Sequence, residues 1–271
     1  MSNITNLAGK PNYGIDAPGL VRGFLVGGLV LLTLSGIGFA IAAQGRWITW
    51  LAQILLLPAG YALGMFGLML RESLVSKVIG REAILDQVPW TGGETVLDVG
   101  CGRGLMLVGA ARRLTTGRAV GVDIWLERDQ SANTESAPLE NARLEGVFDR
   151  VTVQTADMRA LPFADHSFDV VISSWAVHNL EVPVDRSKAL SEMIRVLRQS
   201  GTIVLTDIVY RNDYDAELRR LGADTVRMVI GSAAKDWFLG LVSFGSYQPA
   251  TLVAKGFRGT HLGLPCTIPP R

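Results

Sequence analysis

Two long apolar runs without any charged residue stand near the N-terminus of the sequence. Residues 23–45 and residues 47–70 contain no Asp, Glu, Lys or Arg, and only Arg46 separates them. A helix needs roughly 20 apolar residues to cross the hydrocarbon layer of a membrane, because each residue adds about 1.5 Å to its length. Both runs are long enough. They therefore predict a tight hairpin of two transmembrane helices over residues 23–70.

Basic and aromatic residues at the ends of the runs indicate how this hairpin is oriented. Basic residues flank it on the outer side of both runs: Lys10, Arg22, Arg71, Lys77 and Arg81. The turn holds Arg46 alone, so the positive-inside rule places both ends in the cytoplasm. Trp47 and Trp50 match an interfacial aromatic belt. We expect a multi-pass membrane protein with its C-terminal domain in the cytoplasm.

Two other interpretations of the apolar runs remain open. The motif "AIAA" resembles a signal-peptide cleavage site, but the run is longer than a typical signal core and a second run follows. A buried helical hairpin in a soluble core is the other interpretation. Gly23 with Gly27, and Gly60 with Gly64, match the GxxxG spacing of helix pairs, which allows a homodimer through the membrane helices. Pro58 predicts a kink in the second helix.

The polar lead-in, residues 1–22, contains Pro11 and Pro18 and is not expected to form a long helix. It is expected to lie along the membrane surface or to pack under the C-terminal domain.

From residue 71 onward, short β-rich runs alternate with amphipathic helical patterns. The predicted strands are "TVLDVG", "RAVGVDI", "RVTVQTA", "FDVVISSW" and "GTIVLTDI". This alternation indicates an α/β domain over residues 71–256, with a parallel sheet covered on both faces and a tail over residues 257–271. Ligands of such sheets bind beyond the carboxyl ends of the strands. Residues 237–244 are interpreted as a core strand, or as the wall of an apolar acceptor pocket or a membrane contact.

Charge and cysteine content exclude several classes of function. The net charge of +1 argues against a nucleic-acid partner, because proteins that bind nucleic acids usually carry a basic face. The two cysteines, Cys101 and Cys266, form no CxxC pair, so neither a disulfide framework nor a thiolate metal site is expected.

The stretch "VLDVGCGRG", residues 96–104, is the strongest local indication of a ligand. Gly100 and Gly102 permit a tight turn and a close approach to the backbone. Asp123 ends the next predicted strand, where a carboxylate can accept the hydroxyls of a ribose. The spacing is GxGxG rather than the GxGxxG of dinucleotide sites, and the preceding Asp98 would repel a pyrophosphate but attract an ammonium group. S-adenosylmethionine carries a ribose and an ammonium and has no phosphate.

Here the sequence resembles the class I S-adenosylmethionine-dependent methyltransferases, in particular the group that includes small-molecule and quinone-type enzymes. The resemblance covers residues 84–210 and rests on four motifs in order: "VLDVGCGRG", "VGVDIW", "TADMRALPFADHSFDVVISSWAVHNL" and "MIRVLRQSGTIVLTDI". It implies a Rossmann-like sheet with flanking helices, preceded here by the two transmembrane helices.

The resemblance assigns cofactor contacts position by position. Gly100 and Gly102, with Cys101 between them, would pass under the methionine part, and Asp98 would support this turn or a water near the ammonium. The remaining implied contacts are the ribose carboxylate Asp123, an adenine-side apolar residue at Ile124 or Trp125, the adenine acceptor Asp157 with its neighbour Met158, and Ser174 at the methionine end. The polar segment "LERDQSANTES" that follows is either a loop over the cofactor or a solvated helix start.

His178 is the best candidate for a general base, because it follows the fourth predicted strand and histidine titrates near neutral pH. Asp207 and Tyr210 are weaker candidates on the acceptor side. Together these features predict a membrane-anchored methyltransferase acting on a small lipophilic acceptor: a lipid, a quinone-like phenol or a thiol. The alternative is a membrane-tethered S-adenosylmethionine-binding scaffold or sensor without catalysis. No metal is expected.

Overall fold

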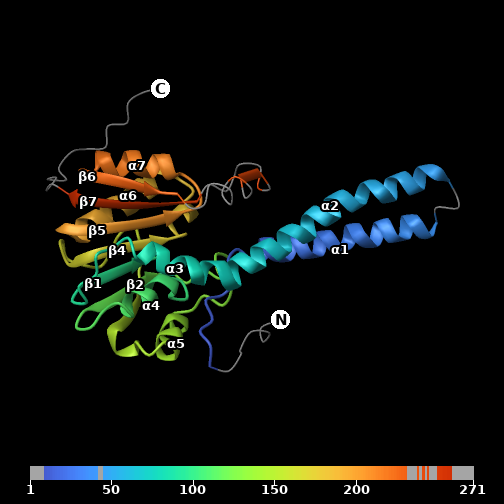
Figure 1. The fold of residues 1–271 in the computed structure, drawn as a ribbon. Helices are drawn as coiled ribbons and strands as arrows, with labels where there is room; N and C mark the ends of the chain where they lie inside the picture. The colour runs from blue at the N-terminus through green and yellow to red at the C-terminus, as the bar shows by residue number, and fades with distance from the viewer. Residues whose placement is uncertain are drawn as a thin grey trace.

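In a computed structural model, the protein consists of a sheet domain and a helical hairpin that projects from it (Figure 1). The structure describes residues 9–41, 45–230, 237, 240, 241, 243 and 249–257. Cys266, His261 and the predicted tail beyond Phe257 lie outside these residues.

Seven strands form one mixed sheet in the order β3-β2-β1-β4-β5-β7-β6. Their bounds are β1 Thr95–Val99, β2 Arg118–Asp123, β3 Val151–Thr155, β4 Phe168–Ser174, β5 Leu197–Asp207, β6 Ala223–Val229 and β7 Ala250–Phe257. The first five strands run parallel, as predicted. The prediction of a wholly parallel sheet is wrong for β7, which pairs antiparallel with both β5 and β6.

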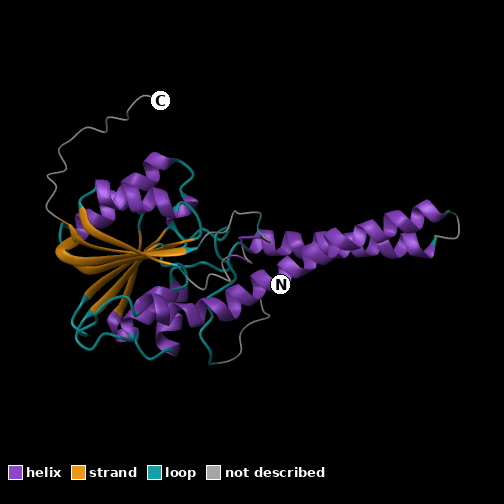
Figure 2. Ribbon diagram, turned by 45° about the horizontal axis from the view of Figure 1, so that its top comes forward, coloured by secondary structure: helices purple, strands orange, loops and turns teal. Residues whose placement is uncertain are grey.

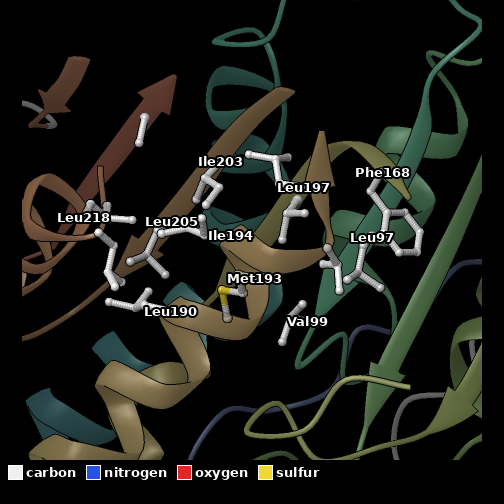
Figure 3. Close-up of a cluster of buried hydrophobic side chains, with 14 of the residues drawn as sticks. Leu97, Val99, Phe168, Leu190, Met193, Ile194, Leu197, Ile203, Leu205 and Leu218 are labelled. Carbon is white, nitrogen blue, oxygen red and sulfur yellow. The ribbon is translucent and has the colours of Figure 1, made fainter. Parts of the chain in front are cut away.

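Helices cover both faces of the sheet, as expected (Figure 2). Their bounds are α3 Lys77–Leu85, α4 Leu105–Ala111, α5 Ser136–Leu144, α6 Pro183–Val196 and α7 Arg211–Arg220, with short 3₁₀ turns η3 Phe148–Arg150 and η4 Val177–Asn179. Successive strand residues point to opposite faces. Leu97 therefore joins the core under α6 and α7, with Met193 and Leu218 (Figure 3), whereas Val96 joins the core under α3 and α4.

The two apolar runs form long antiparallel helices, α1 Pro18–Ala40 and α2 Arg46–Arg71. At 1.5 Å per residue their 23 and 26 residues measure about 35 and 39 Å. Helix α1 begins five residues earlier than predicted, because Pro18 is suited to the first turn of a helix. Helix α2 passes through Pro58 and continues through the π-helical turn η2 Glu72–Ser76 into α3.

The hairpin is held together by small residues, and most of its apolar surface is uncovered. The Ser35 hydroxyl donates to the Ala52 carbonyl at 2.8 Å, and a side chain at Gly28 would collide with Leu63. Apolar side chains such as Leu57, at 79%, are exposed. This does not match a hairpin buried in a soluble core. The GxxxG glycines meet no atom within 4 Å at the position of a Cβ, so they do not serve this packing: Gly23, Gly27, Gly60 and Gly64.

The lead-in packs against the domain, which is one of its two predicted positions. The Tyr13 hydroxyl donates to Glu145 at 2.5 Å. The buried Lys77 ammonium donates to the Tyr13 and Gly14 carbonyls and forms an ion pair with Asp16 at 3.1 Å. These bonds tie residues 12–17 to the base of the hairpin and to the domain at once.

Candidate active site

One cavity of about 1030 Å³ opens at the carboxyl ends of the parallel strands, where the fold predicts the ligand. It gathers the cofactor residues that the sequence singled out, apart from Trp125, together with the candidate base: Asp98, Gly100, Cys101, Gly102, Asp123, Ile124, Asp157, Met158, Ser174 and His178. Tyr210 is not among the lining residues. Its ring stacks on the Arg186 guanidinium, 3.9 Å from Cζ to the ring centroid, and its acceptor-side role stays a prediction.

The glycine turn after β1 requires its glycines. Gly100 and Gly102 adopt φ angles of 74° and 49°, which L-residues with side chains rarely adopt. A Cβ at Gly100 would lie 2.3 Å from the Cβ of Ala176, and one at Gly102 would lie 2.7 Å from Gln130 Oε1. The turn therefore exposes its backbone to the cavity without side chains at these two positions, so a ligand can approach the main chain closely.

Asp98 is a buried carboxylate with an unsatisfied oxygen. It is 1% exposed, and Oδ2 has no hydrogen-bond partner. Burial raises its pKa to about 7, and the nearby charge of Asp123 adds to this effect. An unpaired carboxylate in a cavity wall is suited to a cationic ligand, because a buried charge is costly unless it is paired. The ammonium of S-adenosylmethionine fits this requirement.

Asp123 braces the turn and faces the cavity. Its Oδ2 accepts the Gly102 N–H at 2.8 Å and its Oδ1 accepts the Trp125 N–H at 2.7 Å. Oδ1 also accepts from Asn133 Nδ2 at 3.4 Å, so Oδ2 is the oxygen that can accept a second bond, from a ribose hydroxyl.

The structure distinguishes between the two apolar candidates that follow Asp123. Ile124 lines the cavity and is 51% exposed. Trp125 packs against the core and donates from Nε1 to Thr155 Oγ1 at 2.7 Å. Ile124 is therefore the residue in position to contact an adenine.

Asp157 and Met158 follow β3, the strand beside β2, and line the cavity. The Arg159 guanidinium bonds Asp157 Oδ2 at 2.6 Å and Asp185 Oδ2 at 2.8 Å. Its hydrogen bonds hold the pKa of Asp157 below the usual range, so this side chain is an acceptor near neutral pH.

Cys101 is an inert residue of the cavity wall, because burial raises the pKa of its thiol.

His178 lies on the turn after β4 and is fixed by Asp207 at the end of β5. Nδ1 of His178 lies 2.5 Å from Asp207 Oδ1, and its backbone N–H donates to Oδ2 at 3.1 Å. Asp207 also accepts from the Ile208 N–H and the Tyr214 hydroxyl. An ionised carboxylate only accepts, so Nδ1 carries the proton and Nε2 is the basic nitrogen. This pair was not predicted, because the sequence presented Asp207 and His178 as separate candidates.

The segment after Asp123 is a loop beside the glycine turn, so the interpretation as a solvated helix start is wrong. Gln130 Oε1 accepts the Arg103 N–H at 2.8 Å, and Gln130 Nε2 donates to Asp16 Oδ1 at 3.0 Å. Gln130 therefore joins the lead-in to the glycine turn, a role that no local pattern in the sequence indicates.

One detail of the cavity wall could not be assigned from the sequence. Trp175 lines the cavity with a φ of 54°, a strained conformation for a bulky residue, and strain of this kind is frequent at functional sites.

Trp237, Gly240 and Leu241 are helical, and the side chains of Trp237 and Leu241 are exposed. This contradicts a core strand at these positions.

Comparison with known proteins places the site in a recognised domain. The methyltransferase domain family matches residues 97–205. A methyltransferase of Streptomyces halstedii named GfsG is 36% identical over 135 residues, which cover 49% of this chain and 45% of that protein. The ubiquinone/menaquinone biosynthesis C-methyltransferase UbiE of Geobacter sulfurreducens is 35% identical over 126 residues, 44% of each chain. The chain thus matches slightly less than half the length of these relatives.

Solved structures agree on the fold. A geranyl diphosphate methyltransferase in complex with S-adenosylmethionine superposes with a TM-score of 0.53 and 21% identity, covering 71% of this chain and 91% of that chain. The [4+2]-cyclase SpnF superposes with a TM-score of 0.52 and 18% identity, covering 67% and 82%. Since the second of these is named a cyclase, the fold alone does not determine the reaction.

Proposed function

We propose that this chain, in which residues 97–205 form an S-adenosylmethionine-dependent methyltransferase domain, transfers a methyl group to a small lipophilic acceptor at the cytoplasmic face of a membrane. The observation that carries the proposal is the cavity itself. Its wall contains three carboxylates, Asp98, Asp123 and Asp157, together with His178.

The roles of the residues follow from their positions. When bound, S-adenosylmethionine supplies a methyl group already activated by a sulfonium. Asp98 would balance the charge of the ammonium, Asp123 would hold the ribose and Asp157 would accept from the adenine amino group. Orientation of two reactants can contribute about 7–11 kcal/mol in favourable cases. His178 Nε2 would remove a proton from the acceptor atom, while Asp207 stabilises the imidazolium that forms.

The membrane location is supported by the hairpin. Both α1 and α2 are long and apolar enough to cross a membrane, and little of either is buried by the rest of the described chain. Trp47 and Trp50, at 66% and 63% exposed, lie at the far end, where a membrane interface would place aromatic rings. The basic residues at the near end favour a cytoplasmic domain. The outward GxxxG glycines also leave a homodimer through the membrane as a prediction.

The names of similar proteins support a small apolar acceptor. Relatives are named as methyltransferases of ubiquinone and menaquinone biosynthesis and of a sterol. Their names favour a small apolar acceptor here, without deciding between oxygen, nitrogen, sulfur and carbon as the methylated atom.

The test is transfer of a labelled methyl group. The full chain in lipid nanodiscs is incubated with methyl-labelled S-adenosylmethionine and a total membrane lipid extract, and the lipid and aqueous fractions are searched by mass spectrometry. We expect a labelled product in the lipid fraction that is lost in His178→Ala. Cofactor binding without any labelled product in either fraction would favour the alternative, a membrane-tethered scaffold or sensor.

A further inference from the structure

The cavity extends beyond the cofactor residues onto the hairpin. The apolar part of its wall comes from both long helices: Leu20, Phe24, Tyr61, Met65, Leu68 and Met69. The same cavity reaches Asp98 and His178. Its volume of about 1030 Å³ is at the upper limit of ligand pockets, which span roughly 300–1,000 Å³. It has room for a second molecule beside the cofactor.

This apolar wall reaches well up the hairpin. Tyr61 lies ten residues before Arg71 (71 − 61), or about 15 Å along α2. Phe24 lies six residues after Pro18 (24 − 18), or about 9 Å along α1. The two rings contact each other edge to face across the helices, with centroids 6.2 Å apart. Phe24 follows the flanking Arg22 by two residues, so a membrane-spanning hairpin would hold this pair of rings near the cytoplasmic boundary of the lipid layer.

Between the apolar wall on the hairpin and the strand ends, the cavity is lined by a lysine and an aspartate whose charges balance each other. Lys77 and Asp16 both line the cavity and form an ion pair at 3.1 Å. An apolar chain could therefore lie against the hairpin while its head reaches the strand ends, without leaving an uncompensated lysine at the junction.

We infer that the apolar wall on α1 and α2 is a binding subsite for a single apolar chain. The occupant is a bilayer-dissolved amphiphile, with its tail along Phe24, Tyr61 and Met65 and its methyl-accepting head at His178. This rests on the proposed function and adds a substrate class and a route to it: the acceptor enters sideways from the membrane rather than from water. The hairpin is then part of the binding site as well as an anchor.

The first experiment detects the tail directly. The probe is 4-dodecylphenol with a diazirine on its terminal carbon, added to the full chain in nanodiscs with S-adenosylhomocysteine, irradiated and mapped by mass spectrometry. We expect labels on cavity residues such as Met65 and Phe24. Labels confined to outward residues such as Leu57 would overturn the inference.

A matched pair of variants provides the second readout. Met65→Trp fills the apolar wall, whereas Leu57→Trp adds the same ring on the same helix at a position 79% exposed and outside the cavity lining. We expect labelling of Phe24 to fall at least fivefold in Met65→Trp and to stay within twofold in Leu57→Trp. Equal labelling in both variants would contradict a tail subsite.

Calorimetry in the same nanodiscs separates this inference from the proposed function. Uptake of S-adenosylmethionine is expected to be the same in the wild type and Met65→Trp, because Met65 belongs to the tail wall. A chain that takes up no cofactor would refute the proposed function, while the labelling pattern still decides on the subsite. Cofactor uptake without cavity labelling would refute the subsite alone.

Discussion

Nδ1 of His178 lies 2.5 Å from Oδ1 of Asp207, although 29 residues separate the two in the sequence. Asp207 is 1% exposed and ends β5, while His178 sits on the turn after the neighbouring strand β4. The parallel pairing of β4 and β5 brings the two together. The arrangement fixes the ring with Nε2 as its base, which is how an oriented histidine serves general-base catalysis.

Replacing His178 by alanine should slow methyl transfer about 10²–10⁴-fold, the usual contribution of a general base. Cofactor affinity should change little, because the ring is assigned to the acceptor. The measurement is the turnover number with saturating lipid extract, beside calorimetric cofactor binding. Replacing the exposed His166 by alanine is the control. A His178→Ala variant with wild-type turnover would remove the histidine from the mechanism.

Asp123→Asn should weaken S-adenosylmethionine binding by about 10–100-fold, since a hydrogen bond to a charged group contributes roughly 1.5–3 kcal/mol. Asp149→Asn removes the same charge at an exposed position outside the cavity and should leave affinity unchanged. Calorimetric titration of the two variants provides the comparison. Equal losses in both would mean that overall charge, rather than a ribose contact, sets the affinity.

Cofactor binding should release a proton from Asp98 below neutral pH. With a pKa of about 7, this carboxyl is mostly protonated at pH 6, and the ammonium of the cofactor favours its ionised form. Affinity should therefore rise from pH 6 to pH 7. Titrations at pH 6 in buffers of different ionisation enthalpy should show nearly one proton released. Asp98→Asn should abolish the release, and an unchanged release in that variant would assign the proton to another group.

The same shift affects the stability of the cofactor-free domain. An aspartate in an unfolded chain has a pKa near 4, below that of buried Asp98. Its contribution to the unfolding free energy is therefore fully present below pH 4 and is lost as pH rises through about 7. Asp98→Asn should raise the melting temperature relative to the wild type more at pH 7.5 than at pH 5. The opposite trend would contradict a raised pKa.

Gly100→Ala should destabilise the domain and weaken cofactor binding at least tenfold. Its φ of 74° disfavours alanine by roughly 1–2 kcal/mol, and the new Cβ would collide with Ala176. Gly146→Ala is a matched control, because Gly146 has a φ of 71° and open space around it. Thermal unfolding should show a loss in both variants, whereas cofactor titration should show a loss only for Gly100→Ala.

The parts of the fold that depend on local pattern were predictable from the sequence. The glycine turn and the carboxylates Asp123 and Asp157 follow strands whose apolar character is visible in a few residues. The parallel order of the first five strands brings such ends to one edge. The choice between Ile124 and Trp125 was not predictable, because it depends on which side chain reaches Thr155.

The remaining features are contacts between distant segments. The pairing of Asp16 with Gln130 and Lys77 joins residues more than 60 positions apart. The antiparallel insertion of β7 between β5 and β6 depends on the long connection that precedes it. No periodicity in the sequence encodes either contact. They arise from the three-dimensional packing of the lead-in, the hairpin base and the last strands.

The most direct test of the account is calorimetric titration of the full chain in nanodiscs with S-adenosylmethionine and, separately, with NAD. We expect saturable uptake of one S-adenosylmethionine per chain, lost or strongly weakened in Asp123→Asn, and no uptake of NAD. Clear uptake of NAD with none of S-adenosylmethionine would contradict it.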